Sequence, residues 1–126
     1  MDVLFAYGTL LYPHLLRRLL GRLPDTCAAE LDGYARYTVR GENYPGLVPE
    51  DGTVTPGALF YGLTPREWGI LDRYESEVYE RRLVTTRRVD GQSCQAYAYV
   101  VPPPHRHLLS DTPWDPIQPP LPTETN

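Results

Sequence analysis

The sequence predicts an α+β fold, in which about six strands form a mostly antiparallel sheet or small barrel beside two short helices. Three observations lead to this prediction. An apolar strand at residues 3–6 runs into a glycine-containing turn and a leucine-rich helix. A second helix begins at Thr64-Pro65, and two alternating segments, 81–89 and 95–101, follow it as a predicted strand pair.

The first half of the chain contains one helix and several extended segments. Residues 13–21 predict a helix, with Pro13 in its first turn and Gly21 at its end. Its leucines share one face, and its arginines are expected in solvent. Residues 26–31 and 34–39 alternate like two strands, and Asp32-Gly33 between them predicts a hairpin turn.

The extended pattern continues to the second helix. Residues 44–49 predict an extended segment, Asp51-Gly52 a further turn, and residues 54–63 a strand. Thr64 is then a suitable N-cap, because Pro65 can occupy the first helical position and Glu67 can complete a capping box. This helix is expected to run through Tyr74.

The last part of the chain changes composition. Asp90-Gly91 predicts a hairpin turn between the two late strands. From about residue 102 the sequence is rich in proline, which predicts an irregular tail that wraps on the body or is disordered at its end. We expect a single domain over residues 1–126.

Composition limits the possible functions. The net charge of −4 argues against a nucleic-acid partner, and no apolar run is long enough to span a membrane. No signal peptide is recognisable, so a cytoplasmic location is expected. The 12 basic residues are all arginines, which excludes a Schiff-base lysine, a phosphate-loop lysine and a Ser–Lys dyad.

Cysteine and histidine give no sign of a metal or a cofactor. Cys27 and Cys94 match no metal spacing and are expected to be small buried thiols. His105 and His107 follow three prolines, in what we predict to be an exposed loop. We therefore expect neither a metal site nor a cofactor.

Two segments carry residues suited to chemistry. A turn at Gly8, between a strand and a helix, leaves backbone N–H groups that suit an anion such as a carboxylate. On the second helix Glu75 shares a face with the apolar Leu71. Helical spacing alone is consistent with surface positions for both Asp72 and Glu75. In a partly apolar pocket, however, a carboxyl group has a raised pKa and can act as an acid and base.

The order of several short motifs resembles the γ-glutamylcyclotransferase-like superfamily, in its AIG2-like and γ-glutamylamine cyclotransferase branch. The resemblance covers roughly residues 3–116. The motifs are Tyr7-Gly8-Thr9-Leu10, Tyr44-Pro45-Gly46-Leu47, Val54…Gly57…Leu59-Phe60-Tyr61, Leu71-Asp72-Arg73-Tyr74-Glu75, Tyr79-Glu80-Arg81-Arg82 and Tyr97-Ala98-Tyr99. It implies a small β-barrel flanked by helices, and an enzyme that converts γ-glutamyl amides into 5-oxoproline and a free amine.

The resemblance also assigns roles to residues. Tyr7, Gly8, Thr9 and Leu10 match the substrate loop, whose amides hold the α-carboxylate of the γ-glutamyl group. Glu75 matches the catalytic glutamate, and Tyr79 matches a tyrosine of the pocket. One departure is that the family has glycine or another small residue after this glutamate, where this chain has Ser76.

Three functions remain open at this point. The chain is a cyclotransferase acting on a small γ-glutamyl compound, a non-catalytic member that binds a small carboxylate, or an interaction protein that uses its proline-rich tail. Glu75 favours the enzyme, because a module that binds an anion gains nothing from a carboxylate beside its anion loop. The resemblance names no particular γ-glutamyl compound and no oligomeric state.

Overall fold

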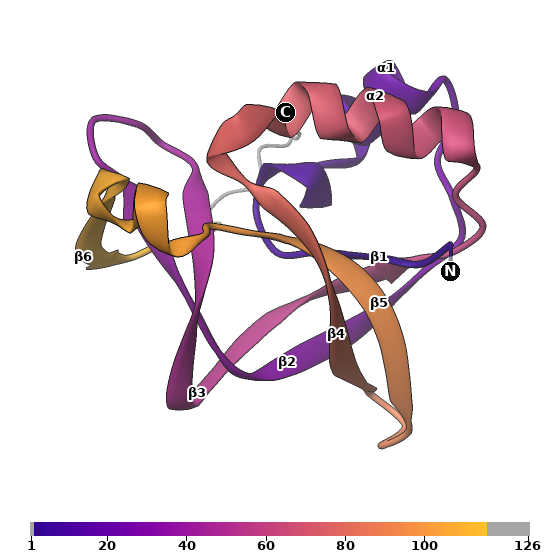
Figure 1. Cartoon of the computed structure of the whole chain (residues 1–126). Helices are drawn as coiled ribbons and strands as arrows, with labels where there is room; N and C mark the ends of the chain where they lie inside the picture. Colours follow the sequence, from indigo (N-terminus) through magenta and orange to yellow (C-terminus); the bar gives the residue numbers. More distant parts are fainter. Residues whose placement is uncertain (1, 116–126) are drawn as a thin grey trace, which may run out of the picture.

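The computed structural model describes residues 2–115, in which six strands and two α-helices alternate with short 3₁₀ turns (Figure 1). The α-helices are α1 (Pro13–Leu20) and α2 (Pro65–Glu75). The strands are β1 (Leu4–Ala6), β2 (Thr26–Val39), β3 (Pro45–Phe60), β4 (Glu80–Arg88), β5 (Ser93–Val100) and β6 (Leu109–Pro113). The 3₁₀ turns are Thr9–Leu11, Ser76–Val78 and Pro103–Leu108.

Five of these strands close into a barrel, and β6 extends the sheet along β2. The barrel order is β1, β3, β2, β4 and β5, and β5 pairs back onto β1. The pairs of β5 with β1 and with β3 are parallel, whereas the other pairs are antiparallel. The predicted α+β fold, a small and mostly antiparallel barrel flanked by helices, is therefore confirmed.

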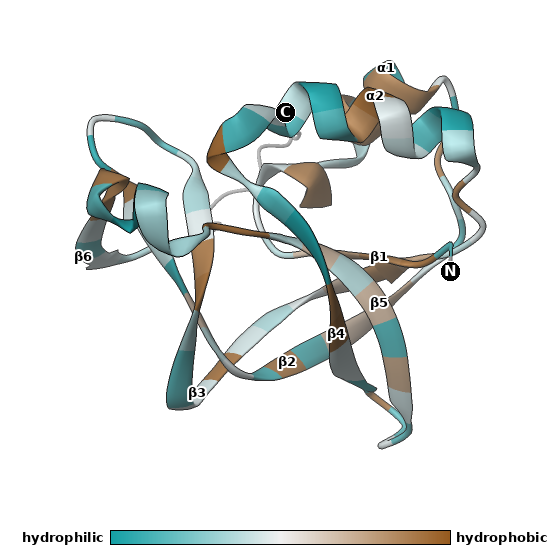
Figure 2. Cartoon of the chain, in the orientation of Figure 1, coloured by the Kyte–Doolittle hydropathy of each residue, from teal (hydrophilic) through white to brown (hydrophobic). Residues whose placement is uncertain are grey.

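Strand β1 is buried on both faces, which explains its uninterrupted apolar sequence. Val3, Phe5 and Tyr7 point into the barrel interior. Leu4 and Ala6 point outward and pack beneath the two helices. Figure 2 shows β1 and much of α1 in the brown of apolar residues, whereas α2 is mostly teal or pale. This strand leads directly into the turn at Gly8, so the barrel core fixes where that turn lies.

Helix α2 begins as predicted. The Thr64 side chain accepts a hydrogen bond from the Glu67 amide, and the Glu67 carboxylate accepts one from the Thr64 amide. Glu67 is only 3% exposed and is bonded at both oxygens by Arg22, at 2.7 and 2.8 Å. The Arg22 side chain remains 45% exposed, and it also neutralises this buried carboxylate.

The prediction of a hairpin at Asp32-Gly33 was wrong, because β2 runs through this point as one strand. The turn at Asp51-Gly52 is likewise absorbed into β3. The register between the two strands shifts here, so that Asp32 pairs with Val54 but Tyr34 pairs with Pro49. Gly33 and Gly52 have φ angles of 81° and 84°, and these residues bend the two-stranded ribbon instead of ending it.

The tail is more regular than predicted. Residues 103–108 form a 3₁₀ turn, and β6 then pairs with the end of β2. Leu109 packs on Val39 and Val101 in a small core of its own. Trp114 is buried, with 8% of its surface exposed. The residues from 116 onward, for which disorder was predicted, lie outside the described residues.

The other side-chain predictions have mixed outcomes. Cys27 and Cys94 are half-buried free thiols, not fully buried ones, and the Cys27 sulfur lies 3.2 Å from the Tyr61 hydroxyl. No helix in the described part of the chain is long and apolar enough to cross a membrane. Within residues 2–115, no three His, Cys, Asp or Glu side chains are grouped as a metal site would require.

Candidate functional site

A pocket of about 680 Å³ opens where three segments far apart in the sequence meet. One wall is formed by residues 7–10 after β1, and a second by residues 39–45, which connect β2 to β3. The third wall is the end of α2 and the turn after it, from Tyr74 to Tyr79. The volume suits a small molecule.

The loop after β1 forms part of this pocket. Gly8, Thr9 and Leu10 all line it. The carbonyls of Gly8 and Thr9 accept hydrogen bonds from the amides of Leu11 and Tyr12, at 2.9 and 3.0 Å. In contrast, the amides of Gly8, Thr9 and Leu10 donate to no acceptor within residues 2–115. This loop therefore contains three N–H groups that lack an acceptor in the described part of the chain, and such groups can bind carboxylates.

Gly8 is required here by a close contact more than by its backbone angle. Its φ is −130°, which other residues also adopt. A Cβ atom at this position would lie 2.7 Å from Cγ and 3.0 Å from Cδ of Pro45. The pyrrolidine ring is tied to its own backbone and can change only its pucker, so glycine lets the loop pack against the opposite wall.

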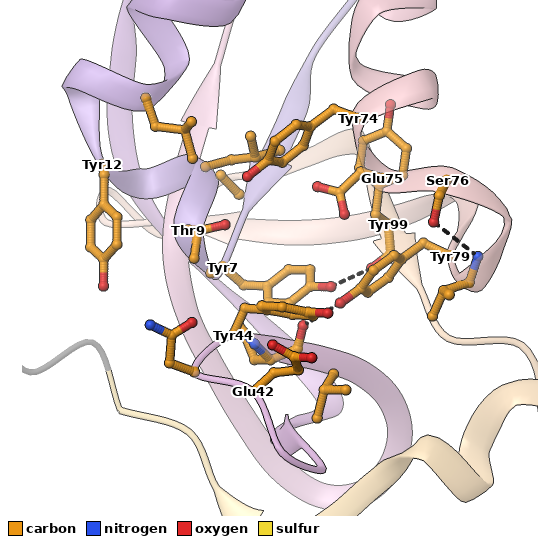
Figure 3. A pocket seen from close by; sticks show the side chains of 18 of the residues that line it. Tyr7, Thr9, Tyr12, Glu42, Tyr44, Tyr74, Glu75, Ser76, Tyr79 and Tyr99 are labelled. Carbon is orange, nitrogen blue, oxygen red and sulfur yellow. Dashed lines mark hydrogen bonds between the residues drawn. The ribbon is translucent and has the colours of Figure 1, made fainter.

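Glu75 is the last residue of α2, and its carboxylate points into the pocket. In the view of Figure 3 this carboxylate lies above the rings of Tyr7, Tyr44 and Tyr79, and Thr9 lies to its left. Within the described residues it has no hydrogen-bond or ion-pair partner. Burial raises its pKa from 4.5 to about 7, because the surroundings disfavour the charged form.

Asp72, one turn earlier on α2, has a different environment. Its side chain is 44% exposed, as a surface carboxylate would be, yet its Oδ1 accepts a hydrogen bond of 2.7 Å from the Tyr99 hydroxyl. Arg81 lies 3.5 Å from the same oxygen and stacks over the Trp68 and Tyr97 rings. Arg81 thus pairs with Asp72 and leaves Glu75 without a cation.

Two tyrosine hydroxyls are fixed near Glu75 by hydrogen bonds that they donate. Tyr7 donates to the Tyr99 carbonyl at 2.6 Å, and Tyr79 donates to the Pro45 carbonyl at 2.8 Å. Burial, and then the nearby Glu75, raises the pKa values of Tyr7 and Tyr79. Both phenols therefore stay protonated, so they shape the pocket without competing with Glu75 for protons.

Ser76, directly after Glu75, has an unusual backbone. Its φ is 65° and its ψ is −173°, and it is the one non-glycine residue with positive φ among the described residues. This conformation favours glycine, which explains the small residue that the family resemblance places at this position. The strained turn redirects the chain after α2, so that Tyr79 returns to the pocket that Glu75 enters.

Sequence reasoning missed several residues that line the pocket. Tyr44 and Pro45 were noted only as part of a motif, and Tyr74 and Tyr99 were not assigned to the site. Arg18 also lines the pocket, although the α1 arginines were expected to face solvent. The available signal was the tyrosine content, since 10 of the 126 residues are tyrosines and several stand within the short motifs.

The raised pKa of Glu75 predicts a pH-dependent stability. Below about pH 4, Glu75 is protonated in both the folded and the unfolded protein. Between about pH 4 and pH 7, the folded protein keeps the Glu75 proton, whereas the unfolded chain has lost it. Stability should therefore fall as pH rises through this window, and level off above it. The unfolding free energy of Glu75→Gln minus that of wild type should therefore increase by up to about 3 kcal/mol from pH 4 to pH 8. Urea unfolding at the two pH values measures this change. If the unfolding free energies of Glu75→Gln and wild type differ by the same amount at pH 4 and pH 8, Glu75 is not buried in a way that raises its pKa.

Comparison with known proteins agrees with this architecture. The family model described as "Gamma-glutamyl cyclotransferase, AIG2-like" matches residues 4–116. AIG2-like protein D of Arabidopsis thaliana is 32% identical over 102 residues, which are 79% of this chain and 67% of that protein. AIG2-like protein C of the same plant is 34% identical over 98 residues, 77% of this chain and 57% of that protein. The chain thus spans between about half and two thirds of the length of these relatives.

Solved structures show the same fold. An Arabidopsis thaliana protein of known solution structure superposes with a TM-score of 0.77 at 26% identity, covering 87% of this chain and 75% of that one. A structure titled gamma-glutamyl cyclotransferase gives a TM-score of 0.69 at 16% identity, covering 80% of this chain and 66% of that one. An AIG2-like protein from Mus musculus gives 0.61 at 21% identity, covering 100% and 99% of the two chains.

Proposed function

The chain belongs to the AIG2-like gamma-glutamyl cyclotransferase family, and we propose that it cyclises a γ-glutamyl amine or peptide to 5-oxoproline and releases the free amine. One observation carries most of this proposal. Among residues 2–115, an ionisable carboxyl group without a partner, Glu75, shares a pocket with three backbone amides that have no acceptor. The amides suit the α-carboxylate of a γ-glutamyl group, and Glu75 suits the ammonium beside that carboxylate.

The reaction needs proton transfer more than it needs a nucleophile from the protein. In the proposed sequence the α-ammonium of the substrate gives a proton to Glu75, and the resulting amine attacks the γ-carbonyl carbon of the same molecule. Glu75 then gives its proton to the leaving nitrogen as the bond from that nitrogen to the γ-carbon breaks. A second proton leaves the attacking nitrogen and ends on the released amine, so that two protons move from the α-nitrogen to the leaving nitrogen.

The pKa of Glu75 suits this exchange. A group with a pKa of about 7 is available near neutral pH both as carboxylate, to accept a proton, and as acid, to return it. Such catalysis typically contributes ~10²–10⁴-fold to the rate. The nucleophile is already tethered to its target, and well-oriented intramolecular reactions reach effective molarities of ~10⁵ M or more. Holding the chain of the substrate in a bent conformation is thus the second task of the pocket.

A screen of γ-glutamyl compounds tests the proposal. γ-Glutamyl amines, γ-glutamyl dipeptides and glutathione are incubated with the protein, and 5-oxoproline is measured by chromatography against a reaction without protein. We expect catalytic release of 5-oxoproline from at least one of them. Binding of such a compound without turnover would overturn the enzymatic proposal and support a non-catalytic module that binds small carboxylates.

A further inference from the structure

Arg36, on β2, lies behind the loop of residues 7–10, and within residues 2–115 its side chain donates only to backbone carbonyls. Its Nη1 donates to the Tyr7 carbonyl at 2.7 Å and to the Pro56 carbonyl at 3.1 Å. Its Nε donates to the Trp114 carbonyl at 3.2 Å. The guanidinium therefore links the residue after β1, strand β3 and the residue after β6 at one point. It is not part of the pocket lining.

Trp114 holds Arg36 in this position and also holds a wall of the pocket. The Arg36 guanidinium lies over its indole ring, 5.3 Å from the ring centroid. The Trp114 amide donates to the Arg36 carbonyl at 3.2 Å, and the indole Nε1 donates to the Asn43 carbonyl at 2.9 Å. Asn43 and the adjacent Tyr44 belong to the β2–β3 connection that lines the pocket.

The bond from Arg36 to the Tyr7 carbonyl acts on the peptide that joins Tyr7 to Gly8. This peptide is planar and trans, so its N–H points away from its carbonyl. Fixing the Tyr7 carbonyl therefore also fixes the direction of the Gly8 N–H, one of the three free donors. A charged donor on the carbonyl further polarises the peptide, which strengthens the N–H as a donor to an anion.

We propose that Arg36 and Trp114 are positioning residues: Arg36 orients and polarises the Tyr7–Gly8 peptide from behind, and Trp114 holds Arg36 and the Asn43 wall together. The part of this inference that concerns turnover rests on the proposed function. The part that concerns the Gly8 amide rests only on the geometry. The proposal makes the C-terminal segment 109–114 a component of substrate binding, although none of its residues lines the pocket.

The experiment compares Arg36→Met and Arg36→Lys with wild type. For Arg36→Met we expect KM for a γ-glutamyl compound to rise at least tenfold, whereas kcat changes less than threefold because Glu75 is untouched. Affinity for 5-oxoproline, measured by NMR titration, should fall by a similar factor, and the free-state Gly8 amide resonance should shift upfield. Lysine keeps the charge but cannot bond the same carbonyls together, so Arg36→Lys should recover part of the affinity.

Two further variants separate positioning from simple stabilisation. Arg22→Gln removes an arginine that bonds Glu67 and the Gly62 carbonyl outside the pocket, so it should lower the melting temperature and leave KM unchanged. Trp114→Phe keeps a ring under the guanidinium but loses the bond to the Asn43 carbonyl, so it should raise KM without moving the Gly8 resonance as far as Arg36→Met does.

The outcomes are decisive either way. A folded Arg36→Met with wild-type KM and an unshifted Gly8 amide would overturn the inference. If Arg36→Met does not fold, the same two readouts on Arg36→Lys decide in its place. If wild-type protein turns over no γ-glutamyl compound, the proposed function fails, and the Gly8 resonance alone then supports or overturns the role of Arg36.

Discussion

Glu75→Gln is expected to lower kcat on a γ-glutamyl amide at least ~100-fold while the protein stays folded and still binds carboxylates. Glutamine has the shape of glutamate but cannot take up a proton from an ammonium or return one to a leaving nitrogen. The side chain makes no hydrogen bond to the described residues, so its replacement breaks no internal contact. Initial rates of 5-oxoproline release and the affinity for 5-oxoproline itself measure the two halves of this prediction.

Two neighbouring carboxylates serve as matched controls. Glu77 is exposed and does not line the pocket, so Glu77→Gln should keep wild-type kcat. Asp72→Asn keeps an oxygen that can accept from Tyr99, so its effect should also be small. Loss of activity in Asp72→Asn together with full activity in Glu75→Gln would mean that the catalytic carboxylate has been assigned to the wrong residue.

Gly8→Ala is expected to damage both binding and stability. The added Cβ would meet the Pro45 ring at 2.7 Å, so either the loop or the opposite wall must move. Overpacking of this kind typically costs about 1–3 kcal/mol, so we expect Gly8→Ala to lose about 2 kcal/mol of unfolding free energy. Displacement of the three free amides should weaken 5-oxoproline binding at least tenfold, with both quantities measured on the same preparation by urea unfolding and NMR titration.

A second glycine provides the control for this substitution. A Cβ at Gly69, inside α2, would have Arg73 Nη1 at 3.8 Å as its nearest neighbour, which is ordinary contact. Alanine is the better helix former, so Gly69→Ala should be neutral or stabilise by about 0.5–1 kcal/mol. A Gly8→Ala protein with unchanged affinity and stability would show that the loop does not need to approach Pro45 closely.

Elements with local causes were predictable from the sequence. The start of α2 is an example, because Thr64, Pro65 and Glu67 satisfy each other within one turn of helix. The hairpin turn at Asp90-Gly91 is another, since β4 and β5 pair directly across it. In both cases the residues that determine the structure are adjacent in the sequence, so tertiary contacts have little to override.

The errors arose where distant contacts decided the outcome. Asp32-Gly33 has the composition of a hairpin turn, yet β2 continues because β3 pairs with it on both sides of the bend. The Thr53 and Thr55 hydroxyls both donate to the Tyr34 carbonyl and hold this bend in place. No pattern within residues 26–39 indicates that β3 pairs with this segment. The sequence could therefore indicate a change of direction at Asp32-Gly33, but not whether it is a hairpin turn or a bend within one strand.

The site was partly predictable for the same reason. Glu75 and the loop at residues 7–10 stand in short motifs, and the structure brings them to one pocket. Arg36 stands in no motif and donates hydrogen bonds to carbonyls from three other segments. Every residue has a backbone carbonyl, so the sequence does not show which carbonyls Arg36 will bond. Glu75 is buried among residues of the loop after β1, the β2–β3 connection and the turn after α2. This burial raises its pKa, and no helical pattern within α2 reveals it.

Isotope labelling of the substrate and of water tests most directly whether the protein cyclises a γ-glutamyl amide. A γ-glutamyl amide carrying ¹⁵N at its α-amine is incubated with the protein in H₂¹⁸O, and the products are analysed by mass spectrometry. Cyclisation predicts 5-oxoproline that retains ¹⁵N in its ring and contains no ¹⁸O, released in equal amount with the free amine. Glutamate carrying ¹⁸O in its γ-carboxyl group would instead show that water attacks the amide, and would contradict the proposed reaction.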